Sequence, residues 1–183
     1  MKAVVIYESM YGHTHQIANA IGEGFRLHGE AVVVPVGEAT AALVESADVV
    51  IVGGPTHVHG MTRVSTRKGA VEAAEKPDAD LVLEPDAEGA GLREWFESVD
   101  QVFTNAAAFD TRFDLPPVVT GRASKGIARK LRHHGATLIA EPESFFVKKD
   151  SHLAPDQVVR AREWGNQLAV SLRRHALDER SAR

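Results

Sequence analysis

The sequence of 183 residues contains no cysteine. This absence excludes disulfides, thiolate-bound zinc, iron–sulfur sites and a cysteine nucleophile, so any redox activity must come from a bound cofactor. Basic residues are not in excess either, because 25 Asp and Glu outnumber 21 Lys and Arg and give a net charge of −4. Such a chain has no excess of basic residues that would attract nucleic acid or an anionic membrane, and we expect neither as a partner.

Long apolar runs are also missing. No stretch approaches the roughly 20 apolar residues that span a bilayer, and the apolar run at residues 3–7 is too short for a secretory signal. We therefore expect a cytoplasmic protein. Hydrophobic residues still make up 44% of the chain, which is enough for a substantial core. We expect a single domain over residues 1–175 and a flexible C-terminal tail over residues 176–183.

Short apolar runs alternate with segments of helical periodicity along the chain. The runs are mostly β-branched and typical of strands buried on both faces of a parallel sheet. The expected strands cover residues 3–7, 31–36, 48–53, 101–109 and 137–140, and Pro142 is expected to interrupt the last one before Phe145. The expected helices cover residues 14–27, 40–46, 92–99, 124–134 and 156–174. This alternation predicts an α/β fold, a doubly wound five-stranded parallel sheet in the order 2-1-3-4-5 with helices on both faces.

A sheet of this kind has a crevice at the carboxyl ends of its first and third strands, where the winding direction reverses. The loops at residues 8–14 and 55–61 follow these strands and should line the crevice. Residues 62–91 are rich in charged residues, Pro, Gly and Ala, and we expect them to form a long insertion rather than a core element. Segments of this length are usually functional lids, interfaces or mobile loops.

The first of these loops has the residues that an anion site requires. Ser9 and Thr14 supply hydroxyls, and Gly12 allows close approach of the backbone to a phosphate. The loop also leads into a helix N-terminus, where free N–H groups and the helix dipole favour an anion. The spacing alone leaves a second reading open, in which one hydroxyl merely caps the helix. A Walker loop and a dinucleotide fingerprint are excluded, because no Gly-Lys-Ser/Thr follows and Gly12 stands alone.

The same stretch resembles the FMN-phosphate signature of the flavodoxin-like family, which includes flavodoxins and their NAD(P)H:quinone reductase relatives. Every constrained position of that signature is met, at Val5, Ile6, Tyr7, Ser9, Gly12, Thr14, Ala18 and Ile21. The glycine–proline turn at residues 53–61 also resembles the flavin-edge loop of the family. The resemblance implies that FMN (flavin mononucleotide) is the cofactor of this chain.

The resemblance also assigns the cofactor-binding residues. The phosphate would be bound by Ser9, Met10, Tyr11, Gly12, His13 and Thr14. The flavin ring would face Pro55, Thr56, His57, Val58, His59, Gly60 and Met61, and the loop expected after the fourth strand would add Asp110, Thr111 and Arg112.

Aromatic residues are scarce in these loops, unlike in well-studied flavodoxins, which sandwich the ring between aromatic side chains in acidic loops. Trp95 and Trp164 lie on helical apolar stripes and are expected in the core. A carboxylate-rich surround disfavours anionic reduced flavin, whereas imidazolium or guanidinium groups favour it. We therefore expect a higher two-electron potential than that of a low-potential carrier.

Histidines are plentiful in the same loops. His13, His15, His57 and His59 raise the alternative of a metal site, but no carboxylate completes a ligand pattern there, and we expect no metal. A serine hydrolase is disfavoured, because Ser9 lacks the Gly-x-Ser-x-Gly context of a nucleophile elbow. The catalytic residues stay unassigned.

Three functions remain open from the sequence. A carrier would pass electrons from FMN to a partner protein. An FMN-dependent NAD(P)H oxidoreductase would act on a quinone-like acceptor in a pocket closed by residues 62–91 or by a second subunit of a homo-oligomer. The third candidate is a flavodoxin-fold binding or regulatory protein without flavin, which fits the missing aromatic sandwich.

Overall fold

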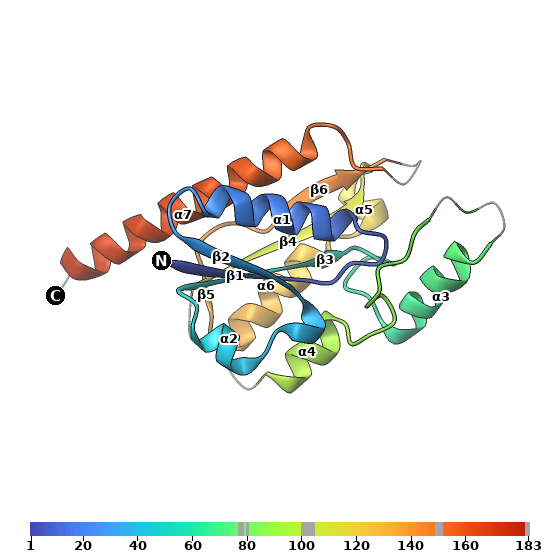
Figure 1. The fold of residues 1–183 in the computed structure, drawn as a ribbon, viewed down its shortest axis with the longest axis horizontal. Helices are drawn as coiled ribbons and strands as arrows, with labels where there is room; N and C mark the ends of the chain where they lie inside the picture. The colour runs from blue at the N-terminus through green and yellow to red at the C-terminus, as the bar shows by residue number, and fades with distance from the viewer. Residues whose placement is uncertain (77–78, 80, 100–104, 149–151, 182–183) are drawn as a thin grey trace.

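The computed structural model describes residues 1–76, 79, 81–99, 105–148 and 152–181. A parallel sheet forms its centre, with the strand order β2-β1-β3-β4-β5 and a further strand, β6, paired with β4 (Figure 1). This order confirms the predicted doubly wound topology. The strands are β1 (Lys2–Tyr7), β2 (Glu30–Pro35), β3 (Val49–Pro55), β4 (Asn105–Phe113), β5 (Thr137–Leu138) and β6 (Glu143–Val147).

The edge of the sheet beside β4 consists of two short strands instead of one. β5 pairs with β4 at Asn105 and Ala106, and β6 pairs with the part of β4 that begins at Phe109. Both run parallel to β4. Pro142 lies in the segment between them and has no N–H to donate to a ladder. The predicted interruption of the fifth strand is therefore confirmed, and the sheet gains a sixth strand.

The fourth strand continues further along the chain than its apolar pattern predicts. Its expected first residues, 101–104, lie outside the described residues, and β4 continues to Phe113. Asp110, Thr111 and Arg112 were expected in a loop, but all three belong to this strand. They are held there because β4 pairs with β3 on one side and with β6 on the other.

Helices cover both faces of the sheet, as Figure 1 shows. On one face lie α1 (His13–Phe25) and α7 (Gln157–Ser181), and on the other lie α2 (Ala41–Glu45), α4 (Leu92–Ser98) and α6 (Ala123–His133). Each face has its own buried core, because successive residues of a strand point to opposite sides. Trp164 is buried on the α7 side and Trp95 on the α4 side, so both tryptophans are core residues as predicted.

Four elements differ from the sequence-based expectation. The insertion contains a helix, α3 (Val64–Ala74), that projects beyond the carboxyl ends of the strands (Figure 1). A short helix, α5 (Pro117–Thr120), follows β4, and a 3-10 turn, η1 (Val36–Glu38), follows β2. α7 continues past the expected end at Arg174 to Ser181.

None of the described helices is both long enough and apolar enough to span a membrane.

Candidate functional site

The loop between β1 and α1 turns sharply at Gly12, whose φ of +84° lies in the left-handed region that favours glycine. The Gly12 N–H donates to Ser9 Oγ at 3.1 Å, so this hydroxyl stabilises the turn. Gly12 is also the N-cap of α1 and offers no side chain to the N–H groups of the first helical turn. The N-terminus of α1 therefore has the form of an anion site.

Thr14 lies in the first turn of α1, with only 2% of its surface exposed. Its hydroxyl oxygen is 2.8 Å from that of Thr111 at the end of β4. Thus neither Ser9 nor Thr14 acts as the helix cap, and the alternative in which one of these hydroxyls merely caps α1 is wrong. The bond also joins the two edges of the crevice.

A pocket of about 380 Å³ opens beside this loop at the carboxyl ends of β3 and β4. The predicted residues that line it are Tyr11, His13, Pro55, Thr56, His57, Val58, His59, Thr111 and Arg112. The lining residues absent from the predicted site are Phe113, Leu115, Val119, Thr120 and Val147. They come from the end of β4, from α5 and the turn before it, and from β6. The apolar residues after residue 112 are the signal in the sequence that could have revealed part of this wall.

Asp110 lies behind the pocket and does not line it. Its side chain is fully buried, and Oδ2 accepts a hydrogen bond of 2.7 Å from the N–H of Ser124 in the first turn of α6. The other oxygen, Oδ1, has no hydrogen-bond partner among the described residues. In this arrangement Asp110 positions α6 against β4.

Residues 57–60 form a tight turn on one side of the pocket. The N–H of His57 donates to Gly60 O at 2.8 Å, and the N–H of Gly60 donates back to His57 O at 3.1 Å. Val58 and His59 at its tip have φ values of +43° and +69°, which a β-branched residue such as Val58 rarely adopts. A bridge between His59 and Gly121 holds this strained backbone in place.

Burial shifts the pKa of two side chains that line the pocket, His57 and Arg112. Burial lowers the pKa of His57 below its usual 6.5, so this imidazole is neutral at pH 7. Burial also lowers the pKa of Arg112, yet a guanidinium stays protonated in proteins. Arg112 therefore places a permanent positive charge in the wall of the pocket.

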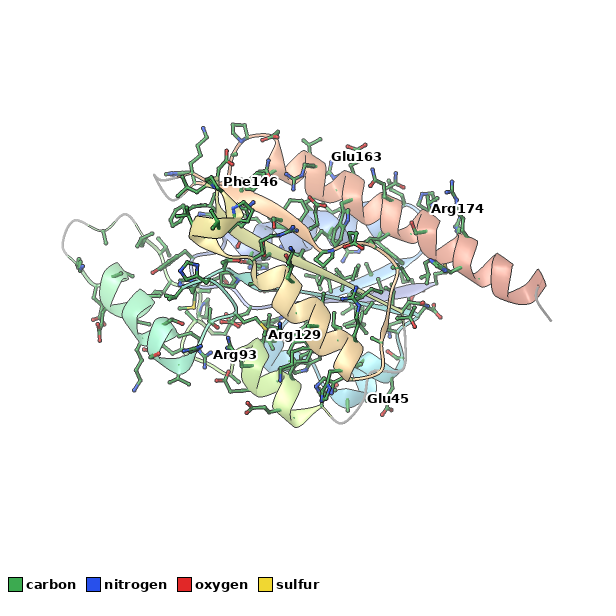
Figure 2. The ribbon with its side chains drawn as sticks, turned by 180° about the vertical axis from the view of Figure 1, so that it is seen from behind. Glu45, Arg93, Arg129, Phe146, Glu163 and Arg174 are labelled. Atoms are coloured by element: carbon green, nitrogen blue, oxygen red, sulfur yellow. The ribbon has the colours of Figure 1, made fainter. Side chains whose placement is uncertain are left out.

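Arg112 is held rigidly against the pocket. Its Nη1 donates to Leu115 O at 2.6 Å, and its guanidinium carbon lies 4.8 Å from the centre of the Phe146 ring, which Figure 2 labels. Its Nε is buried and has no hydrogen-bond partner among the described residues. A buried, charged N–H without an acceptor is uncommon.

Comparisons with known proteins identify the same architecture. The model of the flavodoxin family matches residues 5–83, which include both crevice loops. No curated protein matches the sequence. A flavodoxin from the domain Archaea superposes with a TM-score of 0.63 at 21% identity, covering 94% of this chain and 99% of that one. The chain has a flavodoxin-like fold.

Two further solved structures support this assignment. Flavodoxin 1 from Bacillus cereus has a TM-score of 0.62 at 21% identity and covers 93% of this chain and 98% of its own. The flavodoxin, WrbA-like protein from Agrobacterium tumefaciens has a TM-score of 0.60 at 22% identity, with coverages of 95% and 98%.

The insertion of the flavodoxin-like chain packs directly on the loop that precedes α1. The Tyr11 hydroxyl donates to Ala70 O at 2.8 Å, and the N–H of Glu84 donates to Met10 O at 2.9 Å. Met10 is buried in a small cluster with Ala70 and Ala87. The insertion thus fixes the outer side of the loop.

Glu84 brings a carboxylate to the same place. Its Oε1 lies 3.2 Å from His15 Nδ1 and 3.1 Å from the position that a Cβ would take on Gly12. His15 also stacks on Tyr7, with ring centres 4.6 Å apart, and does not line the pocket. A negative charge is therefore built into the surroundings of the anion loop.

Glu8 connects the start of the loop to the end of the insertion. This carboxylate is buried; it accepts the N–H of Leu92 at 2.8 Å and the hydroxyl of Thr62. Arg67 of α3 is also buried, lies 3.4 Å from the Thr62 hydroxyl and pairs with Glu94 at 3.2 Å. This polar network holds both ends of the insertion at the base of the loop.

Three of the four histidines that raise the possibility of a metal site lie together at the pocket. His13, His57 and His59 line the pocket. Within the part of the chain that the structure describes, no group of three histidine or acidic side chains has the arrangement needed to hold a metal ion.

Proposed function

We propose that this flavodoxin-like chain binds FMN and transfers electrons through it. The observation that carries the proposal is the uncapped N-terminus of α1 at Gly12, placed directly beside the pocket at the ends of β3 and β4. A phosphate at the helix N-terminus and a planar ring in the pocket need this arrangement, which the doubly wound sheet creates at its switch point.

The residues present fit FMN at both ends. The backbone of residues 10–14 would hold the phosphate, with the Ser9 hydroxyl fixing the turn at Gly12. The pocket would hold the ring, and the Arg112 guanidinium would form part of the wall beside it. Bound FMN supplies the hydride and single-electron chemistry that no side chain of this cysteine-free protein can perform.

The charges of the pocket support a potential above that of a low-potential carrier. Arg112 keeps its positive charge and would stabilise negative charge on reduced flavin. His57 contributes none at neutral pH, because burial lowers its pKa. Of these two side chains, Arg112 rather than His57 would therefore supply the positive charge that raises the potential.

The mouth of the pocket suits contact with an apolar acceptor. Val58, Val119 and Phe113 line it and expose 81%, 56% and 47% of their surfaces. These side chains would meet either a quinone-like molecule or the apolar patch of a partner protein.

We further propose that the protein is cytoplasmic, that NAD(P)H is its electron donor, and that a homo-oligomer completes the pocket.

The first experiment tests flavin binding. Purified protein should show absorbance at about 375 and 450 nm, and FMN should bind about 100-fold or more tightly than riboflavin, because only FMN carries the phosphate. Gly12→Val should abolish most of this difference, whereas Gly37→Ala is the control, since a Cβ at residue 37 meets no atom within 4 Å. Colourless protein that ignores added FMN would instead support the flavin-free regulatory protein.

The second experiment separates an enzyme from a carrier. The FMN-loaded protein is mixed with NADPH, with and without a quinone, and oxidation of NADPH is followed over many turnovers. Catalytic turnover that requires the quinone supports the oxidoreductase. Flavin reduction only by a partner reductase supports the carrier.

A further inference from the structure

A second pocket, of about 280 Å³, lies next to the first one. Its lining residues are His57, Val58, Met61, Arg63, Ser65, Thr66 and Arg93. His57 and Val58 line both pockets, so the turn at residues 57–60 borders the two cavities. A molecule bound in the second pocket would therefore lie at the edge of the proposed flavin site.

The charge of this pocket is positive, although the chain as a whole has a net charge of −4. Two of its lining residues are arginines, and no aspartate or glutamate is among the described residues that line it. The neutral His57 imidazole adds a hydrogen-bonding group without adding charge. Two guanidinium groups around one cavity are the donor set that carboxylates and phosphates require.

Arg93 is fixed in place before any ligand binds. Its Nε donates to Thr62 O at 2.8 Å and its Nη2 donates to Met61 O at 3.2 Å, while Nη1 has no hydrogen-bond partner among the described residues. Figure 2 shows Arg93 on α4, on the side that faces α3. The backbone bonds restrict the guanidinium, so little conformational entropy is lost when its remaining N–H groups bind an anion.

Arg63 supplies the second guanidinium from the residue before α3. Its backbone is fixed by Thr66, whose hydroxyl accepts the N–H of Arg63 at 2.8 Å and donates to its carbonyl oxygen at 2.9 Å. The Arg63 guanidinium itself forms no hydrogen bond or ion pair with the residues that the structure describes, and Ser65 adds a hydroxyl to the same wall. The dipole of α3 points its positive end at this position.

We propose that this second pocket binds the phosphate monoester of a phosphorylated nicotinamide dinucleotide that reduces the flavin. A phosphate monoester carries nearly two negative charges at neutral pH, which matches the two guanidiniums better than a single carboxylate does. The phosphate is at the adenosine end of the dinucleotide, so the nicotinamide would reach the proposed ring site by folding back across the turn at residues 57–60, which borders both pockets. The proposal rests on the FMN function argued above, and it assigns a preference for NADPH over NADH.

The direct test is binding of adenosine 2′,5′-bisphosphate to FMN-loaded protein, measured by calorimetry. FMN occupies the loop at Gly12 in this sample, so the probe reports on the second pocket. Arg63→Gln and Arg93→Gln should each weaken binding about tenfold or more. Arg129→Gln is the matched control, because this exposed arginine lies on α6, away from the pocket (Figure 2), and should leave binding unchanged. Binding that is absent, or that is equal in all variants, would overturn the proposal.

A kinetic measurement then tests the identity of the ligand. The ratio of kcat/KM for NADPH to that for NADH should exceed about ten in the wild type and fall towards one in Arg63→Gln. A ratio near one in the wild type would overturn the dinucleotide assignment. Arg93→Gln removes hydrogen bonds to Met61 and Thr62, so it could disturb folding. Arg63 is exposed, so Arg63→Gln should leave folding intact and keeps the test valid.

Failure of the FMN function has a separate signature. If wild-type protein does not bind FMN, calorimetry with the bisphosphate is repeated on Gly12→Val, in which the anion loop is blocked. If Gly12→Val still binds the bisphosphate and the double variant Gly12→Val/Arg63→Gln does not, the second pocket is an anion site even though the chain does not bind FMN. Loss of binding in Gly12→Val alone would assign the probe to the loop and overturn the second pocket.

Discussion

Thr14 and Thr111 meet across the crevice, with their hydroxyl oxygens 2.8 Å apart. Thr14 belongs to the first turn of α1 and Thr111 to the end of β4, and both are buried. The pair therefore couples the proposed phosphate loop to the wall of the proposed ring pocket. This contact would fix the position of the proposed phosphate loop relative to the proposed ring pocket.

Thr14→Val should destabilise the protein by about 1–3 kcal/mol, because it leaves the buried Thr111 hydroxyl without its partner. Thr111→Val should cost a similar amount for the same reason. The double variant should lose less than the sum of the single losses, since neither hydroxyl then remains unpaired. Urea denaturation of all four proteins measures this. Strictly additive losses would show that the two hydroxyls are not coupled.

Gly121→Ala should distort the turn at residues 57–60, although residue 121 is far from this turn in the sequence. Gly121 has a φ of +74°, and a Cβ there would overlap the backbone of His59. We expect a loss of about 1–3 kcal/mol in stability together with weaker FMN binding, because both the strain and the overlap act on the pocket wall. Gly37→Ala, whose Cβ meets nothing within 4 Å, should change neither quantity by a comparable amount. Equal FMN affinity in both variants would contradict this coupling.

Glu84→Gln should strengthen FMN binding. Its carboxylate lies beside Gly12, where it would repel a phosphate dianion. We expect a gain of about twofold to tenfold at low salt that shrinks at high salt, because ions screen the repulsion. Glu88→Gln, an exposed position in the same insertion, is the control. Fluorescence titration with FMN measures the change. Weaker binding in Glu84→Gln would instead show that its bond to His15 matters more than its charge.

The strand order and the anion loop follow from local sequence patterns. Buried strands such as β3 are continuous apolar runs, and their alternation with helices predicts a doubly wound sheet, for which the order 2-1-3-4-5 is expected at this chain length. The loop at Gly12 could be predicted because its hydroxyls, glycine and helix start are adjacent in the sequence. The strands and the loop depend on neighbours along the chain, which the sequence displays directly.

The missed features depend on tertiary contacts. In α3 the buried residues include Arg67 and Ala70 only, so the helix has no apolar stripe to reveal it and is held by the polar network around Glu8. The polar end of β4 became a strand because β3 and β6 pair with it from both sides. Val119 of α5 lines the pocket because of long-range packing, and the periodicity of the sequence does not predict such packing.

The stability of the protein should depend on pH through His57, whose pKa is lowered by burial from its usual 6.5. Because the folded state binds this proton less readily than the unfolded chain does, the contribution of neutral His57 is complete above about pH 6.5 and is lost progressively as the pH falls below it. The difference in unfolding free energy between wild type and His57→Gln should therefore be constant between pH 7 and 8 and shift against the wild type below about pH 6.5. Urea denaturation across this range measures the difference, and NMR titration of the His57 ring should give a pKa below 6.5. A ring pKa above that value would mean that an unrecognised anion faces His57, and the dependence on pH would then have the opposite sign.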